Sequence, residues 1–156
     1  MMKDDASRVK MKSAEIKKNI LSIATDVFSD TRVLFAYLYG SYAVDQAHRF
    51  SDLDIGIYAP RLSQREKLDL EMTLALELDK KLEKGPTSDV RILNSLPLAV
   101  AGKVITEGLL IYCRDDEARI DYETIIRSAY FDFLPFIHNY QQTYLEQIAV
   151  QSDTKD

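Results

Sequence analysis

Two apolar segments, residues 33–39 and 53–58, constrain the fold most, because turn-forming and polar residues bound both of them. Their length and their aromatic and β-branched content predict strands that are largely buried. The first segment ends at Gly40 and Ser41, and the second begins directly after Asp52 and contains Asp54. The sequence therefore predicts a sheet in which a glycine turn and two carboxylates lie close together.

The two carboxylates are expected to share one face of the second strand. Strand side chains alternate, so Asp52 and Asp54 would point the same way, about 7 Å apart, while Leu53, Ile55 and Ile57 fill the opposite face. Like charges that close repel unless a cation lies between them. Mg²⁺ prefers oxygen ligands and is commonly held by one or two carboxylates together with substrate phosphates. This spacing indicates a candidate metal site.

Gly40 and Ser41 stand where the first strand ends, and we expect a short helix to begin near Tyr42. Glycine lets the backbone approach an anion, and serine is a good helix N-cap. The free N–H groups of a helix N-terminus favour phosphate. The segment therefore predicts a phosphate-binding turn beside the carboxylates.

A third strand is predicted over residues 87–93, with Asp89 at its first exposed position. Three carboxylates on neighbouring strands can hold two metal ions, one activating the attacking oxygen and one stabilising the leaving group. Arg91 would share a face with Asp89, where it either contacts a phosphate or pairs with an aspartate. Arg49, in the spacer before Asp52, either approaches a triphosphate or is simply solvated.

These residues resemble the signature of the DNA polymerase β nucleotidyltransferase superfamily, which is Gly-Ser, a spacer, Asp-x-Asp and a later Asp. The matching positions are Gly40, Ser41, Asp52, Asp54 and Asp89. More narrowly, about residues 13–140 resemble the minimal nucleotidyltransferase (MNT) antitoxins that are encoded beside HEPN-domain toxins. The resemblance implies a nucleotidyltransferase fold of the α/β (α+β) class, with a small mixed β-sheet backed by helices. It also implies two Mg²⁺ ions held by the three aspartates, ATP as substrate, and transfer of AMP to a tyrosine hydroxyl of a HEPN ribonuclease toxin.

One loop departs from the pattern of these relatives. Many of them carry Ala-Arg-Gly followed by an acid after the Gly-Ser pair, whereas this chain has Ala43, Val44, Asp45 and Gln46. The loss of that glycine bears on the shape of the loop. The metal ligands and the phosphate turn are unchanged.

Three classes of function stay open at this point. The first is an antitoxin enzyme that adenylylates a HEPN toxin. The second is a small-molecule nucleotidyltransferase of the aminoglycoside-modifying kind, which generally carries an additional substrate-binding domain for which 156 residues leave little room. The third is a non-catalytic antitoxin that neutralises its partner by covering it. Aspartate-to-asparagine substitutions separate the third class from the first, because masking would survive them.

Composition and charge limit the partners and the cellular location that we expect for this protein. The chain has a net charge of −5, and residues 115–156 contain nine acids against three bases, which argues against direct nucleic-acid binding. Residues 1–5 contain acids where a signal peptide has only bases, and no long apolar run follows. We therefore expect a cytoplasmic protein without membrane contact. The single cysteine, Cys113, excludes an intramolecular disulfide.

Four helices are expected, over residues 13–28, from a capping box at Ser63 to Gly85, over residues 97–108, and from Asp116 past Asp132. Pro135 should kink or break the last one. In the second helix one apolar stripe is expected to pack on the sheet, widened by a second stripe beside it. The first stripe is Leu68, Met72, Ala75 and Leu82, and the second is Leu70, Leu74 and Leu78.

The limits of the folded domain follow from composition. We predict a flexible N-terminus over residues 1–12, a nucleotidyltransferase domain over residues 13–145 and a polar tail over residues 146–156. Phe136, Tyr140 and Tyr144 exceed what one small sheet can cover. They are a candidate partner surface, with self-packing or homodimerisation as the alternative.

Overall fold

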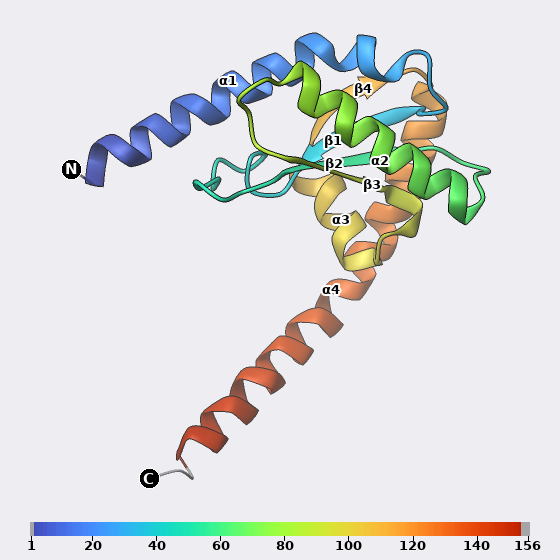
Figure 1. The fold of residues 1–156 in the computed structure, drawn as a ribbon. Coiled ribbons are helices and arrows are strands. Elements are labelled where there is room, and N and C mark those ends of the chain that lie inside the picture. Colours follow the sequence, from blue (N-terminus) through green and yellow to red (C-terminus); the bar gives the residue numbers. More distant parts are fainter. Residues whose placement is uncertain (1, 154–156) are drawn as a thin grey trace.

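A four-stranded mixed sheet forms the centre of the molecule, in the strand order β3-β2-β1-β4 (Figure 1). This computed structural model describes the backbone of residues 2–153 and the side chains of residues 12–152. The strands are β1 (Phe35–Tyr39), β2 (Leu53–Tyr58), β3 (Ser88–Ile92) and β4 (Leu109–Cys113). β1 pairs antiparallel with β2 and with β4, whereas β2 and β3 are parallel. The predicted fold class is confirmed.

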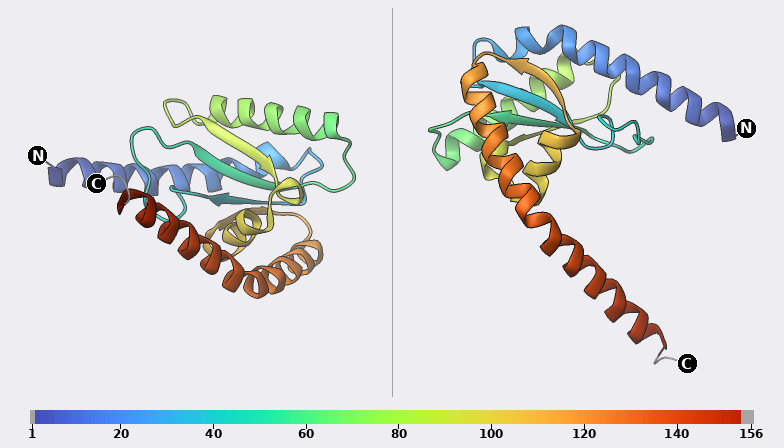
Figure 2. Two further views of the ribbon diagram at one scale, coloured as in Figure 1. Left: turned by 90° about the horizontal axis from the view of Figure 1, so that it is seen from below. Right: turned by 180° about the vertical axis from the view of Figure 1, so that it is seen from behind.

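Helices cover both faces of this sheet. They are α1 (Met2–Phe28), α2 (Gln64–Lys81), α3 (Leu98–Glu107) and α4 (Asp116–Asp153), with a short 3-10 helix over Leu93–Ser95. Figure 2 shows α1 and α2 on one side of the sheet and α3 and the first half of α4 on the other. The larger core cluster joins Ile20, Ile55 and Leu78 on the first side, and the smaller one joins Tyr37 and Val104 on the second.

The capping box at the start of α2 is confirmed. The Glu66 backbone N–H donates to Ser63 Oγ at 3.2 Å, and the Ser63 N–H donates to Glu66 Oε2 at 2.8 Å. Two N–H groups at the helix start are thereby satisfied, which fixes where α2 begins.

The predicted core face of α2 was wrong in part. Leu68 and Met72 are 56% and 59% exposed, whereas Leu74, Leu78 and Leu82 are buried. Two adjacent apolar stripes run along this helix, and periodicity alone does not decide which one meets the sheet. The helix is rotated so that the second stripe packs on the α1 side of the core.

Helices α1 and α4 are longer than expected. The backbone of α1 is helical from Met2, and α4 continues through Pro135 to Asp153. Pro135 does not end the helix, although the axis of α4 changes direction along its length (Figure 2). The predicted domain limits at residues 12 and 145 thus fall inside helices, and they stay predictions. None of the described helices has both the length and the apolar character needed to cross a membrane.

A polar network fixes the first half of α4 to the sheet. The Tyr37 hydroxyl donates to Glu123, and the Arg119 guanidinium lies 3.2 Å from both a Glu123 and an Asp116 oxygen. Burial, followed by the hydrogen bond to Glu123, raises the pKa of Tyr37 far above its usual range. This anchor holds the start of α4 against β1.

Gly102 sets the distance between α3 and α4. A Cβ at this position would lie 2.1 Å from Tyr130 Cδ2, inside the packed core. We expect Gly102→Ala to lower the free energy of unfolding by about 1–3 kcal/mol, which outweighs the gain in helix propensity of at most about 1 kcal/mol. Urea denaturation measures this change, and Tyr130→Ala in the same chain should remove most of the added cost. A Gly102→Ala protein as stable as the wild type would contradict the described packing.

Candidate active site

Three polar side chains form a row across three strands. Tyr39 on β1 is the register partner of Asp54 on β2, and Asp54 is the register partner of Asp89 on β3. Residues directly opposite each other in a sheet share a face. Leu53 and Ile55 lie in the core under α1 and α2, so the row faces the α3 side, as the alternation predicts. The structure thus brings together the predicted residues Asp54 and Asp89.

Gly40 lies directly against the Asp54 carboxylate. Its φ of +71° is in the region that side chains rarely adopt, and a Cβ there would lie 2.2 Å from Asp54 Oδ2. Glycine is therefore needed at this position for two independent reasons. The predicted close approach of the turn to the carboxylates is present.

The short helix expected after Ser41 is not formed. Residues 41–45 are turns, in which the Ala43 N–H donates to the Gly40 carbonyl at 3.1 Å and the Gln46 N–H donates to the Ser41 carbonyl at 2.9 Å. A positive φ at Asp45 is incompatible with a continuing helix. Tyr42, which flanks the turn, is buried. The phosphate-binding element predicted here is consequently a turn that begins at Gly40, without a helix N-terminus.

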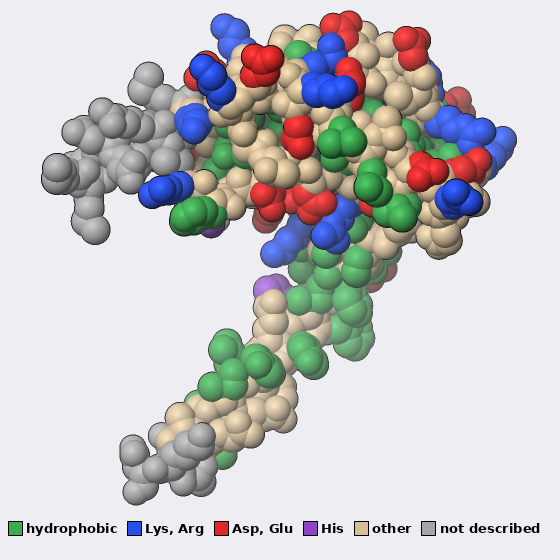
Figure 3. All heavy atoms as spheres, viewed as in Figure 1, with side chains coloured by type: hydrophobic (Ala, Val, Ile, Leu, Met, Phe, Trp, Pro, Cys, Tyr) green, Lys and Arg blue, Asp and Glu red, His purple; other side chains and the backbone are tan. Residues whose placement is uncertain are grey.

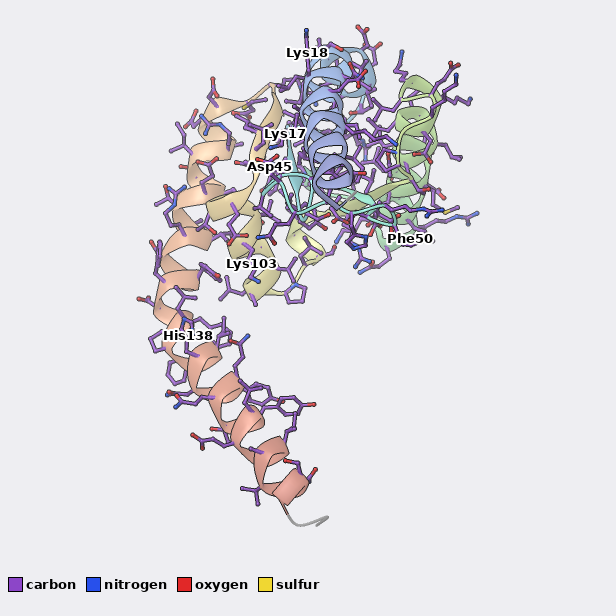
Figure 4. The ribbon with its side chains drawn as sticks, turned by 90° about the vertical axis from the view of Figure 1, so that its left-hand side faces the viewer. Lys17, Lys18, Asp45, Phe50, Lys103 and His138 are labelled. Atoms are coloured by element: carbon purple, nitrogen blue, oxygen red, sulfur yellow. The ribbon has the colours of Figure 1, made fainter. Side chains whose placement is uncertain are left out.

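Asp45 gives the turn after Ser41 a left-handed residue that is not glycine. Its φ of 56° is left-handed, a conformation that glycine adopts freely and aspartate tolerates better than most residues. Lys17 of α1 lies 2.9 Å from Asp45 Oδ1, and Figure 4 shows the two residues next to each other. An exposed pair of this kind contributes at most about 1 kcal/mol. It therefore tethers the loop to α1 more than it stabilises the fold.

Asp52 is exposed and precedes β2, so the strand ladder does not fix its side chain. Its charge nevertheless contributes to raising the pKa of Asp54. Within the described residues, no three or more His, Cys, Asp or Glu side chains form a group that could hold a metal ion. Like charges separate when nothing neutralises them, which fits this arrangement. The assignment of Asp52, Asp54 and Asp89 as a joint ligand set stays a prediction.

The electrostatics of the Asp54–Asp89 pair suit a cation. Burial raises the pKa of Asp54 to about 6, and the charges of Asp89 and Asp52 add to the effect, while Arg91 lowers it. Arg91 lies on the same face of β3 as Asp89, as predicted, and its Nε is 3.3 Å from Asp89 Oδ2. Two carboxylates whose repulsion Arg91 relieves only in part supply oxygen ligands that fit a hard divalent ion. The residues present therefore fit the metal that the sequence pattern implies.

Tyr39 and Glu71 are two further titratable residues near the carboxylates. Burial raises the pKa of Tyr39 to about 12, with further contributions from the charges of Asp54 and Asp89. Burial also raises the pKa of Glu71 on α2, whereas the charge of Arg91 lowers it. Glu71 is missed by sequence reasoning because only the rotation of α2 brings it to β3.

Arg49 lies in an exposed turn before β2. Its guanidinium carbon is 5.4 Å from the centre of the Phe50 ring, and Phe50 is itself 80% exposed. Figure 4 shows Phe50 at the outer edge of the loop. None of the contacts described for this part of the chain joins Arg49 to the aspartates. Its role in nucleotide binding stays a prediction.

The raised pKa of Asp54 can be measured directly in the protein without metal or nucleotide. We expect its carboxyl carbon to titrate in ¹³C NMR with a midpoint of about 6, against an ordinary value of 3.8. Asp89→Asn should lower this midpoint, because the Asp89 charge is the second-largest cause of the rise. Asp69→Asn, an exposed change on α2, should leave it unchanged. A midpoint near 4 in the wild type would contradict the described site.

The amino-acid sequence matches a known family model. The sequence model described as "Polymerase beta, Nucleotidyltransferase" matches residues 18–117, a range that contains all four strands and the glycine turn. No curated protein sequence matches the chain.

Solved structures share the fold. A toxin–antitoxin crystal structure with AMP-PNP matches with 20% identity and a TM-score of 0.56, covering 82% of this chain and 97% of the other. A variant of a toxin–antitoxin pair named MntA-HpeT, in which two aspartates are changed to glutamate, matches with 19% identity, a TM-score of 0.56 and the same coverage of both chains. A protein from Shewanella oneidensis matches with 15% identity and a TM-score of 0.53, covering 83% of this chain and 95% of the other. At these identities the likeness establishes the fold alone.

Proposed function

Because this chain belongs to the polymerase β nucleotidyltransferase family, we propose that it transfers AMP from ATP to a tyrosine hydroxyl of a HEPN-domain ribonuclease toxin. It would thereby act as the antitoxin of that pair. The observation that carries the proposal is the Asp54–Asp89 pair, which is aligned across β2 and β3 with Asp54 lying against the turn at Gly40. Fold neighbours that are toxin–antitoxin structures, one of them with the ATP analogue AMP-PNP, support the choice of partner and nucleotide.

Each residue of the site has a role in this reaction. Asp54 and Asp89, joined by Asp52, would hold the two Mg²⁺ ions. Those ions, when bound, supply positive charge to the triphosphate and to the acceptor oxygen. Gly40 and Ser41 would lie along the triphosphate, because the missing Cβ leaves the backbone accessible. Asp54 must be ionised to act, which its raised pKa makes harder below about pH 6.

The bond changes are those of an in-line displacement. The tyrosine oxygen bonds to the α-phosphorus and loses its proton, and the bond from the α-phosphorus to the bridging oxygen breaks. Pyrophosphate leaves with that oxygen and its electron pair. The products are an AMP-tyrosine ester and pyrophosphate.

The two arginines are proposed to bind the triphosphate. Arg91 shares a face with the carboxylates and is exposed, so its guanidinium can turn from Asp89 to a phosphate oxygen. Arg49 lies at the outer loop, where its charge would attract the nucleotide. Removing Arg91 should affect ATP binding more than removing Arg49, because Arg91 pairs with Asp89, whereas the contact described for Arg49 is with Phe50.

Neutralisation by covering the toxin is the second candidate. The observation that favours it is that the three aspartates do not form a metal-holding group within the described residues. Under this alternative, binding of the toxin would suffice and the carboxylates would be dispensable.

Labelled ATP distinguishes the two functions. Purified protein and the HEPN protein encoded by the neighbouring gene would be incubated with ATP labelled at either the α- or the γ-phosphate. The proposal expects label on the HEPN protein from the α-position alone, and none with Asp89→Asn. Inhibition of the ribonuclease by both the wild type and Asp89→Asn, without label, would establish covering instead.

A further inference from the structure

The second half of α4 projects from the rest of the molecule and carries exposed apolar side chains. Figure 1 shows that this half of the helix extends away from the sheet and from α3. Phe133, Tyr140, Tyr144 and Ile148 are between 42% and 75% exposed. Large aromatic groups in such number are unusual on a free surface, and they indicate a binding face.

These side chains form one stripe that continues from the core. Earlier on α4, Ile126 packs in the core under the sheet, and Tyr130 packs against Gly102 of α3. Helix residues three and four apart share a face. The stripe continues from Tyr130 at spacings of three or four through Phe133, Ile137, Tyr140, Tyr144 and Ile148, which we call the α4 stripe. The face that packs on α3 therefore continues for about 22 Å without a packing partner among the side chains of residues 12–152.

The projecting half is also nearly free of charge. Residues 133–145 include no Asp, Glu, Lys or Arg, in a protein in which 29% of residues are charged. Figure 3 shows the contrast between this helix, with hydrophobic and uncharged side chains, and the charged surface of the remainder. Asn139 and Gln142 lie on the helix side opposite the stripe, although exposed apolar residues such as Leu145 also lie outside the stripe. A complementary surface would accordingly be apolar and uncharged.

The α4 stripe extends from the side of the sheet on which the carboxylates lie. Asp54 and Asp89 lie on the α3 side of the sheet, and the stripe extends the helix face that contacts α3. The space-filling view shows open space between the underside of the sheet region and the projecting helix (Figure 3). Figure 4 shows Lys103 on α3 and His138 on α4 along this side. A protein acceptor has to enter this space to reach the carboxylates.

We propose that the α4 stripe is the docking surface for the acceptor protein, which binds it through an uncharged apolar helix face and thereby presents its tyrosine to Asp54 and Asp89. The identity of the acceptor rests on the proposed function. Anchors at spacings of three and four are those by which one helix packs into the groove of another. A second copy of this chain on the stripe would fill the space through which the acceptor enters. The geometry therefore favours the acceptor as occupant.

Charge substitutions on the stripe test this inference in the full-length chain. The test variant is Tyr140→Glu/Tyr144→Glu, and the matched control, Asn139→Glu/Gln142→Glu, adds the same charge to the opposite side. Both tyrosines are exposed, so the fold should persist, and circular dichroism with Mg·ATP affinity checks this. Tyr140→Ser/Tyr144→Ser provides a second, uncharged disruption. The measurements are affinity for the neighbouring HEPN protein, AMP transfer to it, and oligomeric state by light scattering.

The expected result is an affinity for the HEPN protein about 100-fold weaker in both stripe variants. Transfer should fall in parallel, Mg·ATP affinity should be unchanged, and the control should behave as the wild type. Wild-type binding and transfer by the stripe variants would overturn the docking surface and leave the proposed function standing. Loss of binding in the variants, with a wild type that binds but transfers nothing, would support the surface and refute the function. A wild-type dimer that becomes monomeric in the variants, with HEPN binding intact, would overturn the inference in favour of a second copy.

Discussion

Replacing Asp54 with asparagine is expected to reduce AMP transfer by about 10³-fold while leaving the fold intact. Asparagine keeps the shape of the side chain and removes the charge that would hold a cation against the triphosphate. The position lies inside β2, whose ladder is made by backbone groups that the substitution does not touch. Initial rates with saturating ATP and acceptor measure the loss. Asp69→Asn on the exposed face of α2 is the control and should retain full activity.

The same substitution should stabilise the protein at neutral pH. The pKa of Asp54 is raised to about 6 in the folded state. Between about pH 4 and pH 6 Asp54 therefore binds a proton more readily in the folded protein than in the unfolded chain, and its contribution to stability is lost as the pH rises through this window. Asparagine cannot lose a proton, so the melting temperature at pH 7 should rise by about 2–4 °C. Full activity of Asp54→Asn would refute the catalytic role, and a lower melting temperature would contradict the described electrostatics.

Gly40→Ala is expected to impair activity and stability together. The new Cβ would lie 2.2 Å from Asp54 Oδ2, so either the turn or the carboxylate has to move. The φ of +71° adds backbone strain of about 1 kcal/mol or more. Because a displacement of about 1 Å at a reacting centre can cost about 10²-fold in rate, we expect a loss of that order in AMP transfer. Transfer rates and urea denaturation measure the two effects.

A double substitution separates the steric effect from the backbone effect. In Gly40→Ala/Asp54→Ala the clash with the carboxylate is removed, so part of the lost stability should return while activity stays absent. Ser41→Ala, at the next position, should leave stability close to that of the wild type. A Gly40→Ala protein with normal rates would show that the turn does not approach the carboxylate as described.

The strands and the carboxylate pair were predictable because local patterns determine them. The bounds of β2 match the expected apolar run over residues 53–58, and alternation correctly assigned Asp54 and Ile55 to opposite faces. The alignment of Asp54 with Asp89 follows once β2 and β3 are parallel neighbours. These features depend on residues close in sequence or on one strand pairing.

The parts that were predicted wrongly depend on long-range contacts. The turn after Ser41 takes its shape from the left-handed Asp45, which pairs with Lys17 of α1. No local sequence pattern predicts a pair between residues 28 positions apart. The rotation of α2, which buries Leu74 and exposes Met72, is decided by how α1 and the sheet fill the core together. The length of α4 is a separate case, because the helix continues to Asp153 although its second half projects from the rest of the molecule.

The most direct test of the central claim is the intact mass of the neighbouring HEPN protein after co-expression with this protein. Wild type would be compared with Asp52→Asn/Asp54→Asn, which removes both carboxylates of the Asp-x-Asp pair. The account predicts a HEPN protein heavier by one or more AMP groups with the wild type and unmodified with the variant. A HEPN protein that stays unmodified with the wild type, yet still co-purifies with it and is inhibited, would contradict AMP transfer and establish neutralisation by binding.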